Sequence, residues 1–364
     1  METADSGETA PSTRHAAEES ASQEPAARRA GRAAMAENGR TYFDRQEVRD
    51  PNERERSIFH ALPGLIHHAI DNAPFFREQL AGIAPDSITN RAMLAKIPLV
   101  RKSDLARRQP AQLPFGGAAA TATGRLAHLF CTPGPIYGLE GGRSDYWRFA
   151  RAMYAAGFRR GDVVLNGFDY HLVPDGLMAD SGARALGCPV IPAGSADLDQ
   201  QVQAVADLAP AAYAGSPAGL QSLLDRAASL GVGTASLQKA LLVGEPPAGC
   251  DQESLSEKHG IDSYRCHATA ELGLIAYQTT AGENFIVDES VIVEIVDLRT
   301  GRPTPPGKPG EIVVTAFNPD YPLIRFATGD LAKVVAGESA CGRTNMRLSL
   351  LLGREADDGA AARG

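Results

Sequence analysis

Four short segments of the chain place small, acidic or imidazole side chains directly after apolar runs. They cover residues 131–138, 243–247, 266–273 and 323–331. Their glycines let a backbone approach a flat ligand closely. The carboxylates of Glu271 and Asp330 are oxygen acceptors that suit a hard cation or hydroxyl groups. Because ligands bind beyond the carboxyl ends of strands in an open α/β sheet, these segments predict a binding site at one edge of such a sheet.

Other chemistries find less support in the sequence. Residues 215–219 have the wrong offset for a G-x-S-x-G nucleophile elbow, and the chain has no Walker A sequence and no G-x-G-x-x-G after a strand. His60, His67 and His68 lack Cys or Glu at metal-ligand spacing, so we expect them at the surface or in packing. Five cysteines without a C-x-x-C pair argue against a disulfide framework or a zinc finger and favour reduced thiols.

The bulk composition fits an ordinary globular enzyme. The chain has 364 residues, of which 43% are hydrophobic and 22% are charged, with a net charge of -8. This charge argues against a nucleic-acid partner, which would need a basic face. No apolar run approaches the roughly 20 residues that span a bilayer, and no signal peptide is visible. We therefore expect a cytoplasmic protein that does not bind membranes.

Alternating strand and helix patterns fill the middle of the chain and predict a mainly parallel α/β sheet. Expected strands cover 126–131, 162–168, 188–192, 212–215 and 239–244. Expected helices cover 51–80 with a break at 72–74, a short piece opening at 103–105, and 145–156, 172–186, 199–208, 218–230 and 252–259. After Glu271, residues 291–296 and 311–317 are β-rich and punctuated by Gly and Pro, which predicts an antiparallel hairpin or a small β-barrel-like subdomain.

The chain divides into three expected parts. Residues 1–36 are poor in large apolar side chains, so we expect a disordered extension, or else an upstream extension of the gene. Residues 37–349 form the expected core, and residues 350–364 an expected hinge stub. We therefore expect residues before Met35 to be dispensable for stability.

The ordered set of segments resembles the phenylacetate–CoA ligase branch of the adenylate-forming superfamily. Besides the four segments above, residues 42–44, 318–325 and 341–345 support the resemblance, which covers nearly all of the chain after Met35. It implies the large N-terminal core of that α/β fold. It also implies an acid–thiol ligase that uses Mg-ATP to convert a carboxylic acid into an acyl-adenylate, from which a thiol, usually that of CoA, displaces AMP.

The resemblance assigns roles to individual residues. Asp330 resembles the ribose-binding Asp of the family, and Glu271 resembles the catalytic acid that holds Mg²⁺ at the α-phosphate. The adenine slot is implied to consist of Gly244, Glu245, Pro246, His267, Ala268 and Thr269. The simpler alternatives are a turn Asp, a Glu at a helix N-terminus and an ordinary β-to-α turn. The chain departs from the family at His267, where an aromatic residue is usual, and at Ala270, where a hydroxyl residue is usual.

Two further regions match the family pattern less closely. Residues 132–138 stand where relatives carry a phosphate-binding loop, but only Thr132 and Gly134 fit, two prolines remove backbone donors and no Lys is present. A plain loop is the alternative. Tyr137, Tyr170 and His171 are expected to line the acyl pocket, or else to pack in the core.

The end of the chain would be the family's hinge, with Arg354 as a catalytic residue. In the family a C-terminal domain of about one hundred residues follows and carries the Lys used in adenylation. Because the sequence given stops at Gly364, we expect it to adenylate poorly. A catalytically inactive nucleotide- or acyl-binding protein is the alternative. The implied partners are ATP or AMP, Mg²⁺, coenzyme A and a small carboxylic acid, with a possible homodimer; neither the acid nor the acceptor thiol or amine can be named.

Overall fold

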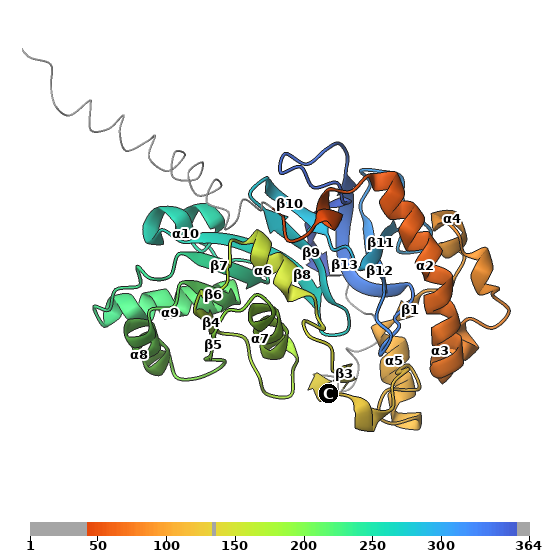
Figure 1. Cartoon of the computed structure of the whole chain (residues 1–364), viewed down its shortest axis with the longest axis horizontal. Coiled ribbons are helices and arrows are strands. Elements are labelled where there is room, and N and C mark those ends of the chain that lie inside the picture. Colours follow the sequence, from red (N-terminus) through yellow and green to blue (C-terminus); the bar gives the residue numbers. More distant parts are fainter. Residues whose placement is uncertain (1–41, 133–135, 355–364) are drawn as a thin grey trace, which may run out of the picture. The chain divides into compact units, whose positions relative to one another are not determined.

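The computed structural model describes residues 42–132 and 136–354, and the following concerns the unit that begins at Phe43 (Figure 1). Its α-helices are α2 (Pro51–Asn72), α3 (Pro74–Gln79), α4 (Arg91–Leu94), α5 (Lys102–Arg108), α6 (Phe149–Ala155), α7 (Asp175–Ala185), α8 (Leu198–Leu208), α9 (Pro217–Ser229) and α10 (Gln252–His259). The expected break at residues 72–74 separates α2 from α3, because Pro74 opens a new helix.

Twelve strands form one mixed sheet. They are β1 (Val100–Arg101), β4 (Val164–Asn166), β5 (Val190–Pro192), β6 (Ala212–Gly215), β7 (Lys239–Val243), β8 (Asp262–Thr269), β9 (Gly273–Thr279), β10 (Gly282–Val287), β11 (Val291–Val296), β12 (Gly310–Ala316), β13 (Phe326–Val335) and β14 (Arg347–Arg354). The order is β11-β12-β13-β14-β10-β9-β8-β7-β6-β4-β5, with β1 added parallel to β13.

The sheet changes character at β8. β4, β5, β6, β7 and β8 pair in parallel, and the helices between them cover the sheet as the alternating pattern predicts. β8 then pairs antiparallel with β9. From β9 to β11 in the sheet order given above, each pair of neighbouring strands is also antiparallel. The expected β-rich region is therefore confirmed, but its strands extend the parallel sheet instead of forming a separate barrel.

Local backbone geometry explains where helices begin. α6 begins at Phe149 and not at residue 145, because Asp145 and Arg148 adopt left-handed conformations with φ of 47° and 65°. α7 begins at Asp175 and not at residue 172, because Leu172 has φ of 60° and Pro174 follows it closely. The helix and strand expected at 252–259 and 212–215 have the predicted bounds.

The strand expected at 126–131 lies outside the large sheet. The structure has β2 (His128–Thr132) paired antiparallel with β3 (Ile136–Glu140) as a separate two-stranded sheet. The expected loop at 132–138 is therefore largely strand within its described part, and Gly134 lies outside the described residues. The sequence pattern did not predict this pairing because Gly and Pro within residues 132–138 are typical of a loop.

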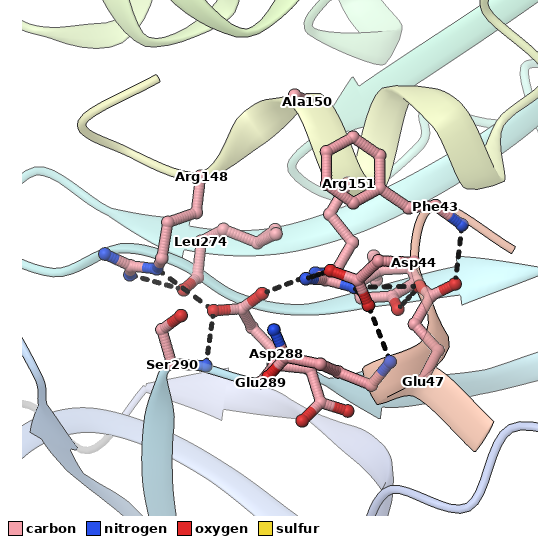
Figure 2. Close-up of polar contacts among 12 residues, drawn as sticks. Phe43, Asp44, Glu47, Arg148, Ala150, Arg151, Leu274, Asp288, Glu289 and Ser290 are labelled. Atoms are coloured by element: carbon pink, nitrogen blue, oxygen red, sulfur yellow. Dashed lines mark hydrogen bonds and ion pairs between the residues drawn. The ribbon is translucent and has the colours of Figure 1, made fainter. Parts of the chain in front are cut away.

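A buried network of charged side chains joins the N-terminal residues to the centre of the chain (Figure 2). Asp44 and Glu47 lie near Arg151, with oxygen–nitrogen distances of 2.7 and 3.5 Å. Arg151 and Arg148 also reach Asp288, at 3.4 and 3.0 Å. Beyond the five residues just named, the network includes the ion pair between Arg54 and Glu289 at 3.0 Å and the hydrogen bond from the Tyr277 hydroxyl to Glu47 at 2.5 Å.

Candidate nucleotide-binding site

The turn after β7 has the geometry of a close-approach loop. Gly244 has φ of 109°, a conformation that residues with a side chain rarely adopt. The guanidinium of Arg265, on the neighbouring strand β8, donates to the Gly244 carbonyl at 3.2 Å and pairs with Glu245 at 2.5 Å. The contacts of Arg265 therefore hold this turn in place. Gly244 and Glu245 are exposed and Pro246 is half-buried, so the turn is also open to a ligand.

His267 near the end of β8 lies beside Asp330 of β13. Nε2 of His267 is 3.5 Å from Oδ2 of Asp330, and the two side chains are 14% and 16% exposed. Asp330 lies inside a strand, which removes the simpler interpretation as a turn residue. A bulge follows His267, so Ala268 and Thr269 depart from the regular register with β9. Strands far apart in sequence therefore bring an imidazole and a carboxylate together beside the β7 turn.

Glu271 occupies the turn between β8 and β9, not the N-terminus of a helix. Its Oε1 atom lies 2.9 Å from Nζ of Lys102, the first residue of α5. Glu271 is 9% exposed in its side chain and Lys102 is 42% exposed. Burial raises the pKa of Tyr321 well above its ordinary value, and the Glu271 charge adds to that rise. The largely buried Glu271 carboxylate is therefore paired with a partly exposed lysine.

The turn that carries Glu271 is held by hydrogen bonds between side chains and the backbone. The Leu272 N–H donates to the Thr269 hydroxyl at 3.2 Å, and Arg148 donates to the Leu272 carbonyl at 2.6 Å. Gly273 has φ of 70°, and a Cβ atom there would lie 2.8 Å from the Trp147 carbonyl. Glycine alone fits this position without strain. Arg148, a member of the charged network in Figure 2, links that network to the turn through the Leu272 carbonyl.

Lys102 reaches the site because β1 pairs with β13. Val100 and Arg101 are in register with Phe326 and Ala327, three residues before Asp330. Arg101 forms two hydrogen bonds to the fully buried carboxylate of Glu311, at 2.9 and 3.0 Å. Glu311 also accepts from the Gly329 N–H at 3.1 Å. One buried carboxylate therefore ties the residue before Lys102 to the residue before Asp330.

Arg325 precedes Asp330 in the same segment but belongs to the scaffold. Its side chain is 2% exposed and pairs with Glu294 at 2.9 Å. It also donates to the carbonyls of Ala95, Ile97 and Gly301. Arg354, the expected catalytic residue of the hinge, is paired by its backbone with Asp330 in the β13–β14 register.

The expected phosphate loop contributes little from its described residues. The Thr132 hydroxyl donates to the Ile136 carbonyl at 3.1 Å, and the side chain is buried. A hydroxyl used in this way is a poor donor for a phosphate. The expected role of Thr132 therefore finds no support in its geometry.

The expected acyl-pocket residues are only partly brought together. Tyr170 and His171 line a hollow of ≈ 290 Å³ beyond the carboxyl ends of β4 and β5. Tyr137 lies on β3 opposite Cys131, whose N–H donates to the Leu172 carbonyl at 2.8 Å. Tyr137 is thus near the same loop but is not part of this hollow. The Tyr170 hydroxyl accepts from Asn166 at 2.6 Å, and burial raises its pKa to about 12.

The side chains fit a magnesium ion that arrives with phosphates. Among residues 42–132 and 136–354 no group of three His, Cys, Asp or Glu could form a metal cage. Mg²⁺ is usually held by one or two carboxylates together with substrate phosphates and water. Glu271 can supply one such carboxylate.

Two features of the described residues concern their cysteines and their helices. None of the five cysteines, all of which the structure describes, forms a disulfide bond. In the described part of the chain, no helix has both the length and the apolar character that a membrane crossing requires.

Sequence comparisons find relatives of the chain among the phenylacetate-coenzyme A ligases. No family model matches the chain. A phenylacetate-coenzyme A ligase of Thermus thermophilus is 29% identical over 326 residues, covering 84% of this chain and 72% of that protein. The Pseudomonas putida enzyme of the same name is 28% identical, covering 87% and 74%, and the Escherichia coli enzyme is 26% identical, covering 87% and 75%.

Comparison with solved structures also finds CoA ligases. A 2-hydroxyisobutyryl-CoA ligase in an open conformation with 2-HIB-AMP and CoA matches with a TM-score of 0.82 and 26% identity, over 90% of this chain and 81% of that chain. The same ligase in the thioesterification state matches with a TM-score of 0.79 and 27% identity, over 85% and 70%. The expected resemblance and the mixed α/β fold of adenylate-forming CoA ligases are therefore confirmed.

Proposed function

We propose that this chain, a homologue of the phenylacetate–CoA ligases, is the core of a carboxylate–CoA ligase that binds ATP, a small carboxylic acid and CoA. The observation that carries the proposal is a contact between β8 and β13, together with an ion pair just beyond β8. Nε2 of His267 on β8 lies 3.5 Å from Oδ2 of Asp330 on β13, and Oε1 of Glu271, two residues beyond β8, lies 2.9 Å from Nζ of Lys102. This arrangement offers a carboxylate for ribose, a second for a cation, and a turn for adenine.

The reaction has two balanced steps. A carboxylate oxygen attacks the α-phosphorus of ATP, the bond to the β-phosphate breaks, and acyl-AMP and pyrophosphate form. The sulfur of CoA then attacks the acyl carbon, the bond to AMP breaks, and acyl-CoA, AMP and a proton result. Magnesium, when bound at Glu271, would neutralise phosphate charge during the first step.

The residues of this chain would bind the nucleotide and the acyl group and orient them. Asp330 would accept hydrogen bonds from both ribose hydroxyls, since an ionised carboxylate has free acceptor positions on both oxygens. The open turn at Gly244 would lie against the adenine ring, and His267 would stack on it with less area than the usual aromatic side chain. The hollow beside Tyr170 and His171 would take the acyl group.

Calorimetry with AMP and a non-hydrolysable acyl-sulfamoyl adenosine tests the proposal. Analogues carrying a phenylacetyl and a 2-hydroxyisobutyryl group should bind more tightly than AMP, since they fill the nucleotide and acyl parts together. An exposed-surface variant, Asp297→Ala, serves as the control and should bind like wild type. Absence of binding for AMP and for both analogues would overturn the proposal.

The buried Thr132 hydroxyl favours a second candidate, a protein that binds nucleotides without activating acids. ATP–pyrophosphate exchange with aryl and short-chain acids separates the two. ATP–pyrophosphate exchange with at least one of these acids supports the ligase. AMP binding without exchange in the presence of each acid supports the second candidate.

A further inference from the structure

We propose that Lys102 is the phosphate-binding cation of this site, which pairs with Glu271 in the empty protein and with the nucleotide phosphate in the complex. The inference rests on the proposed function and deepens it. It assigns the missing cation to α5, far from the segment at 132–138 where a lysine would be sought by resemblance.

The Lys102–Glu271 pair is built asymmetrically. The carboxylate is 9% exposed in its side chain, while the lysine is 42% exposed. A largely desolvated carboxylate needs a compensating charge, and Lys102 supplies it at 2.9 Å. An ammonium has three donors, so contact with one Glu271 oxygen leaves donors for a ligand that approaches from solvent.

The backbone holding Lys102 is fixed, while its side chain can move. Arg101 is bound to the buried Glu311, and its N–H donates to Asp104 at 2.9 Å, which caps the start of α5. Lysine has a flexible four-carbon stem, in contrast to the rigid fork of arginine. The ammonium can therefore turn from Glu271 to a neighbouring anion without any change in the fold.

The phosphate is the anion that the site geometry favours. Asp330, which would hold the ribose, lies three residues beyond the Arg101–Ala327 register pair. Glu271 lies two residues beyond β8, whose His267 meets Asp330. A nucleotide with its ribose on Asp330 extends its phosphate along the carboxylate-lined side, where an uncompensated phosphate would be repelled by Glu271. Lys102 would remove that repulsion.

Binding of AMP and of adenosine, measured by calorimetry without divalent metal, separates a phosphate contact from a structural role. Lys102→Met should weaken AMP binding by about tenfold to a hundredfold, as expected for a lost charge-assisted hydrogen bond, and change adenosine binding by less than about twofold. Lys102→Arg should recover most of the AMP affinity. Lys96→Met removes the charge of another exposed lysine and should bind AMP like wild type.

Glu271→Gln provides the complementary arm. It removes the carboxylate that competes for Lys102 and repels a phosphate, so it should tighten metal-free AMP binding, and the Lys102→Met/Glu271→Gln double variant should bind AMP about tenfold or more weakly than Glu271→Gln alone. Melting temperatures establish that each variant is folded, and Lys102→Gln replaces Lys102→Met if the latter is not.

The outcomes separate this inference from the proposed function. If wild type binds neither AMP nor adenosine, the proposed function fails and the inference with it. If wild type binds AMP and Lys102→Met binds it equally well, or loses AMP and adenosine in parallel, only the role of Lys102 is refuted.

Discussion

Replacing Arg325 with methionine tests whether this residue stabilises the scaffold, as its contacts indicate. The guanidinium is 2% exposed, pairs with the 4% exposed Glu294 at 2.9 Å and donates to three backbone carbonyls. Its loss would leave Glu294 as a buried carboxylate without its cation. Breaking a buried pair from one side typically costs about 3–5 kcal/mol, so Arg325→Met should lower the free energy of unfolding by that amount.

Urea denaturation followed by circular dichroism measures this loss. With a slope of about 3 kcal/mol per molar urea, the midpoint should fall by about 1–1.7 M. The matched control is Arg325→Met/Glu294→Leu, which removes both charges and should recover a substantial part of the loss because no charge is stranded. A single variant within about 1 kcal/mol of wild type, or a double variant as unstable as the single one, would refute the reasoning.

Three further predictions concern nucleotide affinity, pH dependence and thiol reactivity. Asp330→Ala should weaken AMP binding by about 1.5–3 kcal/mol without lowering the melting temperature; unchanged affinity in calorimetry would remove Asp330 from the site. Burial raises the pKa of Asp145 to about 7, although the Ala150 N–H and Arg148 oppose the rise. The folded protein then keeps a proton that the unfolded chain loses near pH 4, so this contribution to stability is complete below pH 4 and is lost as pH rises to 7. Relative to wild type, Asp145→Asn should therefore gain stability between pH 4 and pH 7 in denaturation curves, and a constant difference would contradict this. Burial raises the pKa of Cys341, but hydrogen bonds involving Ser339, Thr279 and Arg343 outweigh it and leave the pKa lowered, whereas burial raises that of Cys266 to about 12. Iodoacetamide at pH 7 should thus label Cys341 well before Cys266 by peptide mass spectrometry, and the reverse order would count against the assignment.

The sequence was informative where structure depends on local pattern. Examples are the apolar spacing of α2, the proline two residues after Asn72 and the short apolar runs of β6 and β11. Each of these signals is contained in one short stretch of sequence. Such signals predicted the parallel half of the sheet. Most strands of the antiparallel half were not predicted individually. The β8–β9 turn has no Gly or Pro before Gly273, and Glu271 could equally have been the first residue of a helix.

The candidate site depends on contacts between distant parts of the chain, which local pattern does not contain. The pairing of β1 with β13 brings Lys102 to Glu271, and no spacing rule links these residues. Arg325 is a similar case: its neighbours in sequence suggest a ligand site, while its burial against Glu294 appears only in the fold. The resemblance identified the acidic residues, but the cation next to them required the structure.

The Arg54 contacts have a consequence for how the chain folds as it is made. Arg54 lies in the first long helix, yet its partners are Glu289, Thr344 and Asn345. At a synthesis rate of about 5–20 residues per second, these partners emerge about 15–60 s after Arg54 itself. During that interval the Arg54 guanidinium lacks these three partners, although α2 can already contact α3, which follows it directly in the chain. The contacts of Arg54 are therefore completed only late in synthesis, and slowing translation anywhere between Arg54 and Asn345 would lengthen this interval.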